Sequence, residues 1–198
     1  FPNYQSAKGV KNGILFLDKE TGISKTADKI KNVANVKINF TDRCNRIKKY
    51  LLSVGAIGHA NHIALGVKGQ SDEKVIMLDG DGALLMHMGS LPVIAHHAAT
   101  NYIHIVINNG SHESVGGQPT EGFFADCCGI AKASGYKKTV SIASEAELEE
   151  WLSNGLTTSE TQFVEIRTSR QSRPDLGRPT GNPGDWKNDF MAALNNDQ

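Results

Sequence analysis

The amino-acid sequence predicts an α/β fold: a doubly wound, mostly parallel sheet flanked by helices. Two short apolar runs, over residues 75–78 and 103–107, close on glycine or asparagine. Runs of this kind are typical of strands that a parallel sheet buries on both faces. A segment with helical spacing joins the two runs, so we expect a strand–helix–strand unit from residue 74 to residue 111.

Length and composition are those of one globular domain, and we expect a single domain over residues 1–198. The chain has 21 basic and 21 acidic residues and therefore no net charge, which gives no indication of a nucleic-acid or membrane partner. No apolar run approaches the roughly 20 residues that span a bilayer. The three cysteines form no disulfide framework, so we expect a reduced, cytoplasmic compartment.

The first part of the chain has weaker patterns, and we assign no functional residue before residue 53. The expected elements are a strand over 13–17, a helix over 24–33 and a short alternating strand over 35–40. A glycine-rich turn then precedes a helix that we expect over 59–66. Small residues on the apolar face of this helix, Ala60 and Ala64, allow close packing.

Inside the strand–helix–strand unit we expect one helix from about residue 83 to residue 98. It contains three histidines, His87, His96 and His97. Spacings of nine residues and of one residue do not gather these side chains on one face of a helix. We therefore expect surface or capping roles for them instead of metal binding.

The C-terminal half continues the alternation of helices and strands. The expected elements are a helix over 123–136, a strand over 138–142, a helix over 144–154, a strand over 162–167 and a helix over 186–194. Ser144 followed by Glu147 predicts a capping box at the start of the second of these helices. We expect Cys127 and Cys128 to be small, buried residues on a helix.

Polar residues follow both apolar runs of the strand–helix–strand unit. The first run ends in Asp79-Gly80-Asp81-Gly82, and the second ends in Asn108-Asn109-Gly110-Ser111. In parallel sheets, ligands bind beyond the carboxyl ends of the strands. The carboxylate of Asp81 and the amide oxygen of Asn109 suit magnesium or calcium better than zinc. A helix that starts near Ala83 would point its amides at the same place, so we predict a metal ion together with a phosphate group.

The spacing of these two loops resembles a known motif. Gly-Asp-Gly at 80–82, then 25 residues, then Asn-Asn at 108–109 is similar to the motif of the thiamine diphosphate (ThDP)-dependent enzymes. The wider segments GDGALLMHMGSL, IVINNGSHESVGGQPT, VGAIGHANHIALG and DLGRPT resemble the decarboxylases of phosphonopyruvate and sulfopyruvate, and the phosphonopyruvate enzymes most closely. The resemblance extends from about residue 53 to the C-terminus.

The resemblance implies ThDP and Mg²⁺ as cofactors. It implies that Asp81, the side-chain oxygen of Asn109 and the backbone carbonyl of Ser111 bind the metal, with two diphosphate oxygens and one water completing six ligands. The backbone amides of Gly82 and Ala83 would face the diphosphate, and Ala83 stands where many relatives carry serine. The remaining expected cofactor contacts are Gly55, Ile57, Gly58, Gly80 and Gly110. Among these, the resemblance implies that Ile57 lies beneath the cofactor and holds it in a bent conformation.

The segment 111–118 is the part that we expect to face a substrate. The resemblance implies decarboxylation of a 2-oxo acid, phosphonopyruvate, to phosphonoacetaldehyde and CO2. Such a site must hold a dianionic phosphonate and supply a proton. His59 and His112 are candidates for anion contact or proton transfer, because imidazole titrates near neutral pH. Glu113 is a candidate acid or base.

One part of such an enzyme is not found in this chain. The resemblance implies that cofactor activation uses a glutamate on a separate pyrimidine-binding domain, and we find no such domain in the sequence. We therefore expect the chain to be the diphosphate-binding half of a homo- or hetero-oligomer, with little or no turnover alone. A partner would be a pyrimidine-binding domain or subunit.

Other functions stay open on the sequence. A β-type subunit of a sulfopyruvate decarboxylase, or another 2-oxo acid decarboxylase, would use the same cofactor residues. A non-catalytic module that retains Mg²⁺ and ThDP, or a nucleotide-binding α/β domain unrelated to thiamine, belongs to a different class. Fold alone does not decide among these functions, because function resides in the site.

Overall fold

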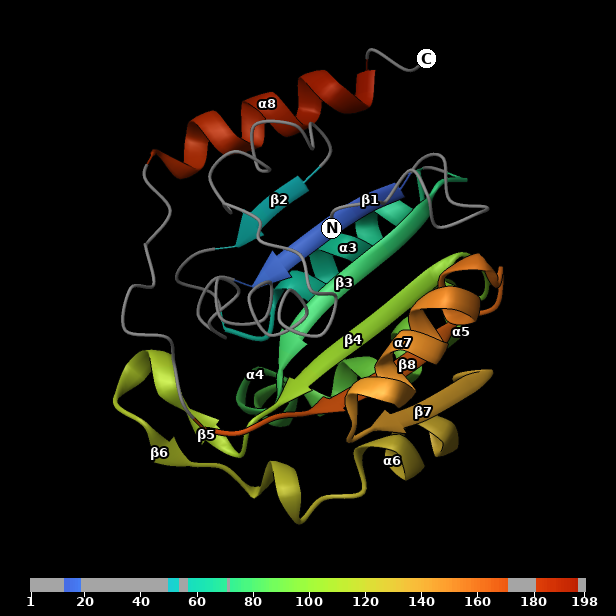
Figure 1. Ribbon diagram of the computed structural model, residues 1–198. Helices are drawn as coiled ribbons and strands as arrows, with labels where there is room; N and C mark the ends of the chain where they lie inside the picture. The colour runs from blue at the N-terminus through green and yellow to red at the C-terminus, as the bar shows by residue number, and fades with distance from the viewer. Residues whose placement is uncertain (1–12, 19–49, 54–56, 71, 171–180, 196–198) are drawn as a thin grey trace.

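The computed structural model describes residues 13–18, 50–53, 57–70, 72–170 and 181–195. A parallel sheet of six strands forms its centre, in the order β2-β1-β3-β4-β8-β7 (Figure 1). Its strands are β1 (Gly13–Asp18), β2 (Tyr50–Ser53), β3 (Lys74–Gly80), β4 (Tyr102–Asn108), β7 (Lys138–Ile142) and β8 (Gln162–Arg167). From β4 the chain crosses to the edge strand β7 and then returns to place β8 between them. The doubly wound α/β fold predicted from the sequence is confirmed.

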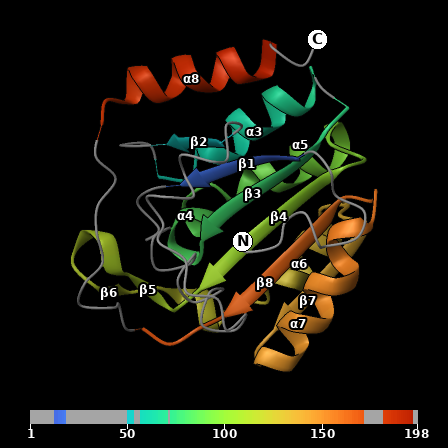
Figure 2. The ribbon, with the colours of Figure 1, turned by 45° about the horizontal axis from the view of Figure 1, so that its top comes forward.

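Helices cover both faces of this sheet (Figures 1 and 2). The α-helices are α3 (Ala60–Lys68), α4 (Asp81–Met86), α5 (Leu91–His97), α6 (Cys127–Ala133), α7 (Glu145–Asn154) and α8 (Pro183–Asn195). Short 3-10 turns are η2 (Met88–Ser90), η3 (Glu113–Val115), η4 (Glu121–Phe123) and η5 (Gly155–Thr157). None of the helices in the described part of the chain is long and apolar enough to cross a membrane.

The alternation of side chains along β3 divides the apolar core into two clusters. Val75 and Met77 point to the face covered by α3, α5 and α6. Ile76 and Leu78 point to the opposite face, which α7 covers through residues such as Trp151. Because every one of these strand residues is buried, each contributes about 1.5–3 kcal/mol of burial free energy. The core therefore fixes β3 and β4 side by side, and with them the loops at their ends.

The single helix expected over 83–98 is wrong. Helix α4 ends at Met86, His87 leaves helical geometry at φ −134°, and η2 connects α4 to α5. Pro92 lies in the first turn of α5, where its missing N–H is tolerated. In one continuous helix from residue 83, Pro92 would instead remove an interior hydrogen bond, so the break before it follows from local chemistry.

The helix expected over 123–136 is shorter in the structure. Asp126 caps α6, its Oδ1 accepting a hydrogen bond of 2.8 Å from the Gly129 amide, and the helix then ends at Ala133. Helix α7 begins as predicted, because the Ser144 hydroxyl accepts from the Glu147 amide and the Glu147 side chain accepts from the backbone of Ser144. The other strands and helices within the described residues match their predicted positions to within a few residues.

Some expectations cannot be compared with the structure, and some elements were not expected. The helix over 24–33, the strand over 35–40 and Gly55 lie outside the described residues. Strand β2 was not expected. The segment 111–118, expected as a loop, instead opens with a small antiparallel hairpin of β5 (Ser111–His112) and β6 (Gln118–Pro119). This hairpin lies at the carboxyl ends of β3 and β4 (Figure 1).

Candidate cofactor and metal site

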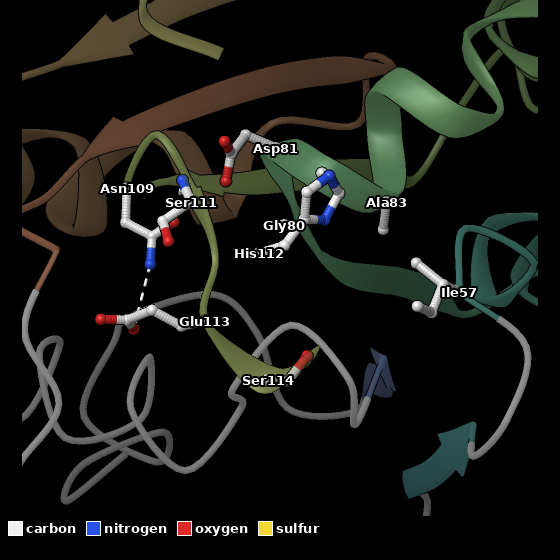
Figure 3. Close-up of a pocket in the computed structure, with 10 residues that line it drawn as sticks. Ile57, Gly80, Asp81, Ala83, Asn109, Ser111, His112, Glu113 and Ser114 are labelled. Carbon is white, nitrogen blue, oxygen red and sulfur yellow. Dashed lines mark hydrogen bonds between the residues drawn. The ribbon is translucent and has the colours of Figure 1, made fainter. Parts of the chain in front are cut away.

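Asp81 and Asn109 face one pocket at the carboxyl edge of the sheet (Figure 3). Asp81 is the first residue of α4, directly after β3, and Asn109 directly follows β4. The two strands pair with Gly80 beside Ile107, which brings the loops together. The pocket opens to solvent, and the empty space within it, open solvent included, is about 330 Å³. We call it the carboxyl-edge pocket; it is lined by Ile57, Gly80, Asp81, Gly82, Ala83, Asn109, Ser111, His112, Glu113 and Ser114.

Asp81 is buried in a polar setting, with 2% of its surface exposed. Thr120 Oγ1 donates a hydrogen bond to Asp81 Oδ2, and the backbone N–H groups of Asn109 and Gly82 also donate to the carboxylate. Burial raises the pKa of Asp81 above its usual value, and these hydrogen bonds offset part of that rise. A cation bound beside Asp81 would remove the remaining cost of burying its negative charge.

The side chain of Asn109 is oriented by two hydrogen bonds. Its Oδ1 accepts from the Ser111 amide at 3.1 Å, and its Nδ2 donates to Glu113 Oε2 at 3.1 Å. Glu113 therefore determines which end of the amide carries the oxygen, because a carboxylate accepts only from the NH2 end. The dashed line in Figure 3 marks this contact.

Asn108 points away from the pocket and holds the turn that carries Asn109. Its Nδ2 donates to the Gly122 carbonyl at 2.6 Å and to Glu165 Oε1 at 2.7 Å. Its Oδ1 accepts from the Gly110 amide at 3.2 Å. These contacts hold the turn that carries Asn109, and Asn108 does not line the pocket.

Glycines allow the backbone around the carboxyl-edge pocket to lie close to neighbouring side chains, because they carry no β-carbon. A β-carbon on Gly82 would lie less than 3.0 Å from the ring of His112, and one on Gly122 would lie equally close to Asp81 Oδ2. Gly110 has φ +63°, a conformation that residues with a β-carbon rarely adopt. The backbone at positions 82 and 122 is therefore in direct contact with the residues that shape the pocket.

Ile57 lines the far side of the pocket from Asn109 (Figure 3). Gly58 follows it with φ +79°, and a β-carbon there would lie less than 3.0 Å from the Ala83 carbonyl and from the ring of His87. The turn before α3 is thus packed directly against the start of α4. This packing places Ile57 beside Ala83 in the pocket wall.

His59 does not line the carboxyl-edge pocket but forms a cluster with two other histidines. The ring centroids of His59 and His87 are 4.2 Å apart, and those of His59 and His62 are 5.6 Å apart. Burial lowers the pKa of His62, and the electrostatic effect of the neighbouring His59 and His87 rings lowers it further. Sequence reasoning missed this cluster, because it needs the break that turns His87 toward α3.

The metal expectation agrees with the donor atoms at the pocket. Among the described residues, no group of three or more His, Cys, Asp or Glu side chains could hold a metal ion alone. The pocket offers one carboxylate, one amide oxygen and backbone carbonyls, so a cation there would need further oxygens from a bound ligand. Hard oxygen donors of this kind fit Mg²⁺, which commonly binds together with substrate phosphates.

The phosphate group predicted from the sequence would be bound by backbone amides and not by the dipole of a long helix. Helix α4 has only six residues, so its dipole is small. Gly80, Gly82 and Ala83 nevertheless line the pocket, and the two glycines bring their backbone to its wall without a side chain. The residues present therefore fit a diphosphate held jointly by amides and a magnesium ion.

Two groups of buried polar contacts, around His104 and around Glu165, were missed by sequence reasoning. Asp79 Oδ2 lies 3.3 Å from His104 Nε2, and His104 Nδ1 lies 3.2 Å from the Tyr136 hydroxyl. Glu165, on β8, supports Asn108 from the other side. A signal was available for both, since His104 and Glu165 interrupt otherwise apolar strands.

A parallel α/β sheet with an oxygen-rich, glycine-lined pocket at its carboxyl edge defines an α/β cofactor-binding domain. Comparison with known families agrees: residues 34–166 match the model of the thiamine pyrophosphate enzymes, C-terminal TPP binding domain. The chain belongs to this family. The resemblance described from the sequence is therefore confirmed at the level of the family.

Individual relatives support the same placement. A phosphonopyruvate decarboxylase of Streptomyces viridochromogenes is 35% identical over 146 residues, which are 74% of this chain and 37% of that protein. A sulfopyruvate decarboxylase subunit beta of Methanococcus maripaludis is 27% identical over 154 residues, which are 77% of this chain and 81% of that protein. The structure of a benzoylformate decarboxylase from Polynucleobacter necessarius matches with a TM-score of 0.59 and 17% identity, covering 83% of this chain and 31% of that one. The chain thus spans little more than a third of the first of these relatives.

Proposed function

We propose that this chain is the diphosphate-binding half of a ThDP- and Mg²⁺-dependent decarboxylase that converts phosphonopyruvate to phosphonoacetaldehyde and CO2. The observation that carries the proposal is the shared pocket of Asp81 and Asn109, whose oxygen donors suit Mg²⁺. Membership of the thiamine pyrophosphate enzyme family supports the cofactor. The likeness to a phosphonopyruvate decarboxylase over 74% of the chain supports the substrate.

Three residues would hold the metal ion: Asp81, Asn109 through its side-chain oxygen, and Ser111 through its backbone carbonyl. The backbone amides of Gly82 and Ala83 would bind the diphosphate, with Gly80 and Gly110 allowing the close approach. Ile57 would support the organic part of the cofactor from below, with Gly58 packing the turn that carries it. When bound, ThDP supplies the nucleophilic carbon and the electron sink that decarboxylation requires.

The chain's own side chains then bind, orient and transfer protons. His112 lies in the pocket wall against Gly82, so its imidazole is the best placed group to exchange a proton near the reacting carbon or to contact the phosphonate. Glu113 is bonded to the Asn109 amide, which favours an orienting role for it over acid or base work. His59 lies outside the pocket wall and would meet only a substrate group that extends past Ile57.

A partner would complete the site. The carboxyl-edge pocket opens to solvent, and all its lining residues come from one domain. The match covers 37% of the phosphonopyruvate decarboxylase, so an enzyme of that kind has further segments that could contribute to such a site. A pyrimidine-binding half, on a separate chain or elsewhere in the same protein, would carry the group that activates the cofactor and would close the pocket against water.

Sulfopyruvate is the second candidate substrate, as in a β-type subunit of a two-subunit decarboxylase. A specific observation favours it: the match covers 81% of the sulfopyruvate decarboxylase subunit beta of M. maripaludis. A subunit of similar length would leave the pyrimidine-binding half on a separate chain. The two substrates differ only in the anionic group, phosphonate or sulfonate, so the same cofactor residues serve both.

The experiment joins this chain to a pyrimidine-binding partner by co-expression and measures CO2 release with Mg²⁺ and ThDP. We expect release from phosphonopyruvate to exceed release from sulfopyruvate, with Asp81→Ala inactive on both. The reverse order of substrates would support the β-subunit function. An assembly that binds ThDP and releases no CO2 from either 2-oxo acid would contradict decarboxylation and leave a non-catalytic ThDP-binding module.

A further inference from the structure

A buried carboxylate lies directly behind the turn that follows β4. Glu165, on the neighbouring strand β8, has 2% of its surface exposed and lies among apolar strand residues. Its oxygens accept three hydrogen bonds: from Asn108 Nδ2 at 2.7 Å, from Ser141 Oγ at 2.6 Å and from Arg167 Nε at 3.2 Å. Glu165 does not line the carboxyl-edge pocket.

Asn108 connects Glu165 to both ends of the segment 109–122. Its Oδ1 accepts from the Gly110 amide at the start of this segment, and its Nδ2 donates to the Gly122 carbonyl at the end. Gly122 in turn lies against Asp81 Oδ2 so closely that a β-carbon would not fit between them. The buried amide of Asn108 thus holds both ends of the segment that carries Asn109 and Ser111. Through Gly122 it also contacts the surroundings of the Asp81 carboxylate.

We propose that Glu165 is a positioning residue for the metal ligands, acting through Asn108. A carboxylate accepts and cannot donate, so Glu165 acts together with the Gly122 carbonyl to hold the NH2 end of the Asn108 amide in place. The amide oxygen must then face the Gly110 amide, which fixes the turn that presents Asn109. This inference rests on the proposed cofactor site, because it assigns a second layer of support to that site.

Packing alone does not explain a carboxylate at position 165. Arg167 pairs with Glu165 at 3.2 Å and offsets part of the cost of burying this charge, but an apolar residue of similar size would often serve stability as well or better. The partners that orient metal ligands typically change metal affinity 10- to 100-fold when they are removed. A buried carboxylate at position 165 is therefore better explained by a role in orienting the turn than by packing.

Three variants of the whole chain separate positioning from general stabilisation. Glu165→Ala removes the acceptor for Asn108. Glu165→Gln keeps an oxygen that can face Asn108 Nδ2, while its NH2 group can donate to the Ser141 hydroxyl and loses the hydrogen bond from Arg167 Nε. Ser141→Ala is the matched control, because it removes another hydrogen bond of Glu165 and leaves Asn108 in place.

Two measurements are made well below the unfolding temperature of each variant. Calorimetric titration with Mg²⁺ and ThDP should show affinity reduced at least tenfold in Glu165→Ala, and within about threefold of the unaltered chain in Glu165→Gln and Ser141→Ala. Hydrogen–deuterium exchange without cofactor should be faster over residues 109–122 in Glu165→Ala alone. This second measurement does not depend on cofactor binding.

The two readouts distinguish failure of this inference from failure of the proposed function. If Glu165→Ala lowers thermal stability but keeps unaltered affinity and unaltered exchange over 109–122, Glu165 has only a structural role and the inference is overturned. Equally fast hydrogen–deuterium exchange over 109–122 in Ser141→Ala would also overturn the inference. If the unaltered chain binds no ThDP with Mg²⁺, the proposed function fails. Faster hydrogen–deuterium exchange over 109–122 in Glu165→Ala would in that case still show that Glu165 holds the turn in place.

Discussion

The imidazole of His112 lies against Gly82 so closely that a β-carbon at position 82 would come within 3.0 Å of its Nδ1 atom. Gly82 belongs to the first turn of α4, directly after β3, and His112 belongs to the hairpin that follows β4. The two loops at the carboxyl edge of the sheet are therefore in direct contact, and a larger residue at either position changes both.

Gly82→Ala should displace the His112 ring, because the side chain and the added methyl group would occupy the same space. We expect affinity for Mg²⁺ and ThDP to fall at least tenfold, about 1.4 kcal/mol. In a His112→Ala background the same substitution should cost much less, and a double-mutant cycle by calorimetry measures this coupling. Equal losses in the two backgrounds would show that the methyl group acts on the backbone alone.

Asp81→Asn should stabilise the protein when no metal is present. Burial raises the pKa of Asp81, so the folded state holds the proton more tightly than the unfolded state does. Stability therefore falls as pH rises from the usual value of 3.8 through the folded-state pKa, and the whole cost remains at neutral pH. The neutral amide avoids this cost.

Thermal unfolding in a chelator from pH 4 to pH 8 measures the effect. We expect Asp81→Asn to unfold at a temperature about 2–4 °C higher at pH 8, which corresponds to 1 kcal/mol in a chain of this size, with the difference shrinking toward pH 4. Mg²⁺ with ThDP should raise the unfolding temperature of the unaltered chain only. A variant less stable than the unaltered chain at pH 8 would contradict this electrostatic explanation.

Tyr136→Phe should lower stability without affecting the cofactor site. It removes the hydroxyl that lies 3.2 Å from His104 Nδ1 and leaves that ring nitrogen buried without its partner. The free energy of unfolding should fall by about 1–3 kcal/mol, measured in urea with an unchanged m-value. ThDP affinity should stay within about twofold, because the contact of Asp79 with the Gly80 amide remains.

Tyr102→Phe is the control for that substitution. Tyr102 is equally buried, but its hydroxyl makes only a long contact of 3.4 Å with the Asn61 carbonyl. We expect a smaller loss of stability from this variant. A loss as large as that of Tyr136→Phe would mean that removal of any buried hydroxyl, and not loss of the His104 contact in particular, determines the cost.

The sheet and the two loop ends could be predicted from the sequence because their patterns are local. The apolar runs before Asp81 and Asn109 are long enough for strands, and glycine and asparagine mark where each ends. Parallel pairing then implies that the two loops meet. The capping box of Ser144 and Glu147 is local in the same way, since both residues belong to one helix turn.

The contacts that support the loops could not be predicted, because they join distant parts of the chain. Glu165 bonds Asn108 across 57 residues, and Lys74 reaches the carbonyl of Leu156 across 82 residues. Because one helix was expected to continue to residue 98, the contact between His87 and His59 was not predicted. Periodicity indicates which residues are buried, but it does not indicate which buried polar groups are partners.

The most direct test of whether the two loop ends hold one metal ion is calorimetric titration with ThDP, with and without Mg²⁺. The unaltered chain, Asp81→Ala and Asn109→Ala are titrated side by side. We expect one ThDP per chain, bound only when Mg²⁺ is present, with affinity at least 100-fold lower in Asp81→Ala and at least tenfold lower in Asn109→Ala. Binding of the same affinity in Asp81→Ala, or without any divalent cation, would contradict the proposed metal site.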